Sequence, residues 1–200
     1  MGFQYINFQD QQENAYCGGF VLAAMINLFK SLPPNKPYGT DIYYEVQHIQ
    51  KTTLTGQRKC FIDKMNLYLH DHNIEGTYSL PSSIAIYAQQ IGLNPTIHYN
   101  ELKLRNVFSS ISKDIKLKKL NVDIFIEEEI SLANSFQIPV FGNAKNFFIA
   151  NSIALVETGM HWIAIGNTEE KEDKKIYYDP WSTNEPIYEY SGINIALNKA

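Results

Sequence analysis

The stretch that decides the fold is CGGFVLAAMINLFKS, residues 17–31. Apolar residues fall on nearly every face of a helix drawn through this stretch, so the helix is expected to be buried on all sides. Leu32-Pro33-Pro34 follows, and a proline ends a helix at or before the residue that precedes it. We therefore expect a central helix around which the rest of the chain packs.

The segments outside this helix show helical spacing first and strand-like alternation later. Helical spacing predicts a helix capped by Thr40, one over residues 60–72, one capped by Ser82 or Ser83 that ends at Gly92, and two more over residues 104–115 and 122–130. Strands are predicted at residues 95–99, 138–142, 161–167, 175–181 and 186–190, with a charged hairpin turn at 168–174. The pattern is typical of an α+β fold, in which an N-terminal helix packs on a C-terminal antiparallel sheet with extra helices.

Composition restricts the class of protein. The 200 residues are 44% hydrophobic and 19% charged, with a net charge of -4, so we expect one globular domain over residues 1–200. The acidic balance argues against nucleic acid as a partner. No Sec signal peptide and no transmembrane stretch is visible, which predicts a cytoplasmic protein, or one secreted without a Sec signal, and no membrane insertion.

The cysteine count leaves no disulfide framework and no cysteine-only zinc site, because Cys17 and Cys60 are the two cysteines. Cys60 is expected to be a packed residue of a helix. His70 and His72 flank Asp71, but residues two apart on a helix point to different faces. The sequence therefore predicts no metal and no cofactor.

Cys17 stands where a loop becomes the buried helix. Free N–H groups and the helix dipole at that end favour a thiolate, the reactive form of cysteine. Gly18 and Gly19 follow, and their missing side chains would let a substrate backbone approach closely. A buried cysteine beside a glycine-rich turn is an alternative interpretation that the residues leave open.

A histidine and an aspartate on one predicted hairpin could serve such a thiol. His161 begins one strand and Asp179 ends the next, so Asp179 could accept the Nδ1–H of His161 and fix its tautomer. Taken singly, a structural histidine at a strand edge and a turn aspartate before Pro180 explain the same residues. Trp162 and Trp181 flank the expected site and could shield it or form a substrate wall, although core packing is expected for at least one.

Three segments carry these residues in a fixed order: QQENAYCGG at 11–19, GMHWIAIG at 159–166 and IYYDPW at 176–181. Together they resemble the papain-like superfamily of thiol hydrolases. In that family a Gln precedes by six residues a Cys that opens a buried helix, a His lies on a central strand, and an Asp or Asn lies on the following strand. Gln11, Cys17, His161 and Asp179 match those places in order.

Two branches of the superfamily are similar to separate parts of the sequence. QENAYCGGFVLAAMINLF resembles the nucleophile helix of phytochelatin synthases, and HWIAIGN with IYYDPW resembles the bacteriocin leader-peptidase family and its stand-alone relatives. Residues 32–140, a variable and mostly helical middle, match no family. Host-directed bacterial effectors with this fold include proteases and glutamine deamidases, so the resemblance also admits a bacterial effector.

The resemblance implies a Cys17-His161-Asp179 triad that cleaves amide bonds through a thioester, a cysteine peptidase by default with a protein or peptide as substrate. Gln11 is then the oxyanion-hole residue, its side-chain amide acting with the backbone N–H of Cys17. Gln9 and Gln12 are neighbours, so the choice of Gln11 depends on the resemblance. A glutamine deamidase, an acyl or peptidyl transferase, and a non-catalytic binding module on the same fold remain alternatives.

Overall fold

The computed structural model describes residues 16–30, 38–56, 58–59, 63, 78–106, 122–142, 151–156, 161–168, 171–180 and 190–199. Its helices are α1 (Cys17–Lys30), α2 (Tyr38–Thr52), α4 (Pro81–Gln90) and α6 (Val122–Ser135), and residues 101–106 are also helical. Its strands are β1 (Leu93–Tyr99), β2 (Val140–Phe141), β3 (Ser152–Val156), β4 (His161–Thr168), β5 (Lys171–Tyr178) and β6 (Tyr190–Lys199). The described residues thus form an α+β structure.

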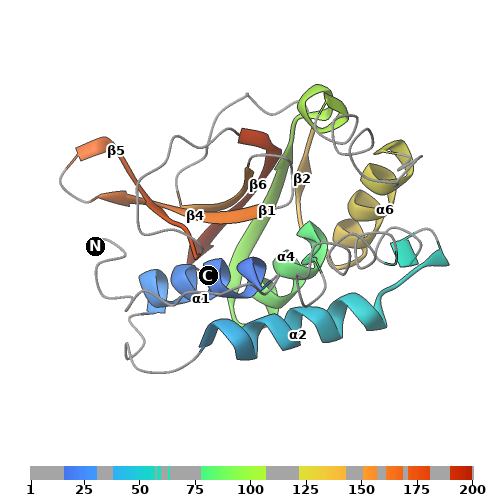
Figure 1. The fold of residues 1–200 in the computed structure, drawn as a ribbon, viewed down its shortest axis with the longest axis horizontal. Helices are drawn as coiled ribbons and strands as arrows, with labels where there is room; N and C mark the ends of the chain where they lie inside the picture. Colours follow the sequence, from blue (N-terminus) through green and yellow to red (C-terminus); the bar gives the residue numbers. More distant parts are fainter. Residues whose placement is uncertain are drawn as a thin grey trace.

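The six strands form one sheet with helices stacked against it (Figure 1). The strand order is β2-β1-β6-β3-β4-β5, and every neighbouring pair is antiparallel except β1 with β2, which is parallel. Helices α1 and α4 pack directly on the sheet, and α2 packs on the outer side of both. Helix α1 therefore lies between a sheet and a second helix, which is why residues on nearly all its faces are apolar.

The core lies on both faces of the central strands. Successive side chains of a strand point to opposite faces, so Trp162 and Ala164 join the main core with α1. Their neighbours in sequence, Ile163 and Ile165, join a second buried cluster with Ala154 and Val156 on the other face. Strands buried on both faces read as apolar runs, which explains why the sequence pattern did not predict β3.

Several boundaries differ from the sequence-based predictions. Helix α2 begins at Tyr38, two residues before the expected cap Thr40. Helix α4 begins at Pro81 after Leu80, so Ser82 and Ser83 lie in its first turn and do not cap it, because proline favours the first helical position. Its expected end at Gly92 is confirmed: Gly92 has a φ of 82° and its N–H binds the carbonyl of Gln89 at 3.0 Å.

The sheet also differs from the prediction of an all-antiparallel arrangement at the C-terminus. Strand β1 precedes α6 in the chain and pairs in parallel with β2, so helices and strands are interleaved. The predicted turn at 168–174 is shorter, since β4 extends to Thr168 and β5 begins at Lys171. Strand β6 runs over ten residues from Tyr190, of which the prediction included the first.

Some predicted elements fall wholly or partly outside the described residues. They are the helix at 60–72 apart from residue 63, residues 107–115 of the next helix, residue 181 of one strand and residues 186–189 of the last. Among the helices that the structure does describe, none is long and apolar enough to cross a membrane.

Candidate active site

Cys17 is the first residue of α1 and is 3% exposed. The carbonyl of Tyr16, directly before it, accepts the N–H groups of Gly19 at 2.9 Å and Phe20 at 3.2 Å, which closes the first turn. The sulfur therefore lies at the positive end of the helix dipole, as the sequence predicted. Burial leaves that sulfur dependent on protein groups for any stabilisation of its charge.

His161 and Asp179 form a short hydrogen bond at the same end of the sheet. His161 begins β4, Asp179 directly follows β5, and these strands pair antiparallel. The Nε2 of His161 and the Oδ1 of Asp179 are 2.7 Å apart, and both residues are buried. The hairpin thus brings together the two residues that the sequence singled out.

The orientation of the imidazole differs from the predicted one. Asp179 was expected to bind Nδ1, but it binds Nε2. Cys17 lies close enough to His161 to raise the pKa of the ring, and Nδ1 is the ring nitrogen that Asp179 leaves for the thiol. The two nitrogens lie on opposite sides of the ring, so His161 bridges the carboxylate and the thiol.

The environment favours the protonated form of His161. Burial alone lowers the pKa of a histidine, but the hydrogen bonds to Asp179 and Cys17, with the negative charges of both, raise the pKa of His161 to about 10. At neutral pH the ring is therefore an imidazolium. A positive ring held between a carboxylate and a buried sulfur stabilises negative charge on that sulfur.

A buried segment, Tyr78 to Leu80, forms a wall beside the first turn of α1. The side chain of Gln50 binds it twice, donating to the carbonyl of Tyr78 at 2.8 Å and accepting the N–H of Leu80 at 2.9 Å. The indole N–H of Trp162 donates to the carbonyl of Ser79 at 3.0 Å. Side chains from α2 and β4 thus satisfy this irregular backbone.

Tyr78 and Trp162 pack against each other within that wall, with ring centroids 6.4 Å apart and an angle of 30° between the rings. Burial, with the charges of Cys17 and Glu129, raises the pKa of Tyr78 well above its ordinary value, so its phenol stays neutral. Trp162 is 0% exposed, so its role here is packing beside His161 and not contact with a substrate. Sequence reasoning missed Gln50, Tyr78 and Ser79, since no motif marks them.

The space left by the two glycines after Cys17 is filled by the protein itself. A Cβ on Gly18 would lie 2.5 Å from the Cβ of Ser79, and a Cβ on Gly19 would lie 2.5 Å from the carbonyl oxygen of Gly39. The sequence suggested that these positions admit a substrate backbone. In the structure they admit the wall segment and the start of α2.

Two predicted site residues, Gln11 and Trp181, lie outside the described residues, and so does Cys60, which was expected to pack within a helix. Within the described ranges no group of three or more His, Cys, Asp or Glu side chains could hold a metal ion.

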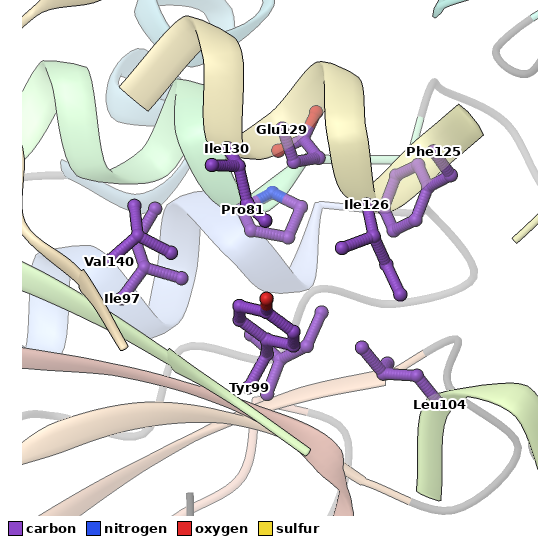
Figure 2. Close-up of a pocket in the computed structure, with 10 residues that line it drawn as sticks. Pro81, Ile97, Tyr99, Leu104, Phe125, Ile126, Glu129, Ile130 and Val140 are labelled. Carbon is purple, nitrogen blue, oxygen red and sulfur yellow. The ribbon is translucent and has the colours of Figure 1, made fainter. Parts of the chain in front are cut away.

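Two cavities lie away from Cys17. One, of about 20 Å³, is lined mainly by apolar side chains, among them residues of β1, α4 and α6, beside Glu129, as Figure 2 shows. That volume holds about one water molecule. The other, of about 470 Å³, is an open groove lined mainly by polar residues near the end of α2 and along α6. Neither cavity contains a residue of the candidate site.

Comparison of the chain with known protein families, with curated proteins and with solved structures finds no match. The geometry of Cys17, His161 and Asp179 therefore carries the functional argument.

Proposed function

We propose that this protein is a papain-like thiol hydrolase that cleaves amide bonds of a peptide or protein through a thioester on Cys17. One observation carries the proposal: His161 is hydrogen-bonded to Asp179 in a buried site, and its interaction with Cys17 helps to raise the pKa of the ring. A histidine with a purely structural role needs no thiol near its second ring nitrogen. A histidine that transfers protons to and from a thiol must have that thiol beside it.

The proposed reaction begins with attack of the Cys17 thiolate on the carbonyl carbon of the scissile amide. Negative charge moves to the carbonyl oxygen, and the backbone N–H of Cys17, at the free end of α1, is one donor for it. The side-chain amide of Gln11 is proposed as the second donor.

His161 then supplies the proton. Its imidazolium protonates the leaving amine, the C–N bond breaks, and the acyl group remains on the sulfur as a thioester. Neutral His161 next takes a proton from water, which attacks the thioester and regenerates the thiolate and the imidazolium. Asp179 holds Nε2 throughout, so the same ring nitrogen faces the sulfur in both halves of the reaction.

Selective alkylation tests the thiolate–imidazolium pair. Iodoacetamide at pH 6 is expected to modify Cys17 much faster than Cys60, with the two sites resolved by peptide mass spectrometry. The variant His161→Phe removes the cation and should slow modification of Cys17 while leaving Cys60 unchanged. Equal and slow labelling of both cysteines in the native protein would contradict the proposal.

The reaction products distinguish a peptidase from a glutamine deamidase. Native protein and Cys17→Ala are incubated with the same peptides, and products are read by mass. Shortened peptides formed by the native protein alone support a peptidase. Ammonia release with peptides of unchanged length would replace the peptidase by a glutamine deamidase on the same residues.

A further inference from the structure

An aromatic cluster is built onto the residue that precedes the nucleophile. The ring of Tyr16 lies with its centroid 4.2 Å from that of Tyr43, and the ring of Tyr43 lies 5.4 Å from that of Tyr44. The hydroxyl oxygens of Tyr16 and Tyr44 are 3.5 Å apart. Tyr44 is 57% exposed, so the cluster extends from the start of α1 to the surface of α2.

Two carboxylates border the exposed ring. Asp41 and Glu45 are one helical turn apart on α2, and Tyr44 lies three residues after Asp41, so all three share one exposed face. Neither carboxylate forms an ion pair within the part of the chain that the structure describes. Apart from burial, their charges are what raises the pKa of Tyr87 on the neighbouring α4. The patch is thus negative as well as aromatic.

We propose that this surface, formed by Tyr16, Asp41, Tyr44 and Glu45, binds the lysine or arginine side chain of a substrate residue close to the amide bond that Cys17 attacks. The inference rests on the proposed function and adds a substrate class to it: peptides with a basic residue beside the scissile bond. The aliphatic stem of a lysine or arginine packs on a tyrosine ring, its cation is attracted to the ring face, and its N–H groups bind carboxylates.

The position of Tyr16 is what links the surface to catalysis. Tyr16 is covalently joined to Cys17, and an extended peptide advances about 3.3 Å per residue. A substrate that extends from Cys17 past Tyr16 would therefore place a side chain near the scissile bond on this surface. An acidic or apolar side chain there would meet two carboxylates that it cannot pair.

A peptide library tests the inference. Peptides made from a denatured proteome by cleavage after glutamate retain internal lysine and arginine, and mass spectrometry identifies those that become shorter or one dalton heavier. Native protein is expected to enrich lysine or arginine about tenfold at one position near the modified residue. The double variant Asp41→Asn/Glu45→Gln should lose this enrichment, and Glu45→Lys alone should lose it as well.

The matched control is Glu127→Gln, an exposed carboxylate on α6, which should keep the enrichment. Thermal melting verifies that each variant is folded. Modified peptides without a basic preference, or a preference that survives in the double variant, would overturn this inference and leave the proposed function standing. A native protein that modifies no peptide, as Cys17→Ala does, would overturn the proposed function.

Discussion

Two buried pairs of charged groups lie in the part of the chain that the structure describes, and they are built differently. His161 and Asp179 are 2.7 Å apart with side chains 7% and 7% exposed, while Arg58 and Glu129 are 3.4 Å apart with side chains 2% and 9% exposed. The first pair lies on one hairpin of β4 and β5, whereas the second joins segments that are far apart in the sequence. They differ in what their remaining polar atoms contact.

The Arg58–Glu129 pair forms hydrogen bonds with the first turn of α4. Arg58 donates to the hydroxyls of Ser82 at 2.9 Å and Ser83 at 2.5 Å, and Glu129 accepts the backbone N–H of Ser82 at 2.7 Å. A guanidinium alone at a helix N-terminus would oppose the helix dipole, so the Glu129 carboxylate offsets it. Every one of these contacts joins α4 to its neighbours.

The His161–Asp179 pair instead leaves one ring nitrogen for Cys17. Burial and charge are therefore common to both pairs, and the interaction with Cys17, a thiol at the start of a helix, sets the His161–Asp179 pair apart.

The largest effect is expected from Asp179→Asn. The change leaves a carbonyl acceptor for Nε2 but removes the charge that stabilises the imidazolium, so kcat/KM should fall about 100-fold or more. Steady-state kinetics on a peptide from the library experiment measures the change in kcat/KM. Asp123→Asn, a change to an exposed carboxylate on α6, is the control and should match the native rate. An Asp179→Asn rate within about twofold of native would place Asp179 outside the catalytic machinery.

The same pair should make stability depend on pH. The pKa of His161 rises from its ordinary 6.5 to about 10 on folding, so the folded chain holds an extra proton between these values. The contribution to the free energy of unfolding is therefore fully present below about pH 6.5 and is lost as pH rises through about 10. Urea unfolding from pH 6 to pH 10.5 should show the native protein losing more stability than Asp179→Asn. An equal loss of stability with rising pH in both proteins would contradict the coupling between His161 and Asp179.

Arg58→Met should lower the stability of the protein and leave its catalytic rate unchanged. The variant leaves Glu129 buried without its cation, and breaking a buried pair in this way costs about 3–5 kcal/mol. Urea unfolding measures that loss, while kcat/KM per folded molecule should stay near native.

The control for Arg58 is Arg105→Met. Arg105 contacts Glu101 and Asp123 on the surface, where solvent screens the charges, so its loss should be far smaller. If Arg58→Met abolished turnover while the protein remained folded, the two buried pairs would not be separate in function.

Local sequence patterns predicted the parts of the site that depend on one element. The apolar run placed Cys17 at the start of α1, and strand alternation placed His161 and Asp179 at one end of a hairpin. They could not predict which ring nitrogen faces Asp179, because that depends on the packing of the ring. Nor could they predict the wall, since Gln50 and Trp162 reach Tyr78 to Leu80 from 28 and 83 residues away in the chain.

The smallest effect is expected where the first turn of α1 meets that wall. In Gly18→Ala the new Cβ would lie 2.5 Å from the Cβ of Ser79, and such overpacking costs about 1–3 kcal/mol even though alanine favours a helix.

Adding Ser79→Gly removes the clashing atom and should restore part of the stability lost in Gly18→Ala, as measured by urea unfolding. Ser79→Ala alone should be neutral or slightly stabilising, because the buried Ser79 hydroxyl has no hydrogen-bond partner among the described residues. A Gly18→Ala variant as stable as the native protein would show that the segment Tyr78 to Leu80 shifts to accommodate the new Cβ. Cys17 would then be held by its interaction with His161 more than by the packing beneath it.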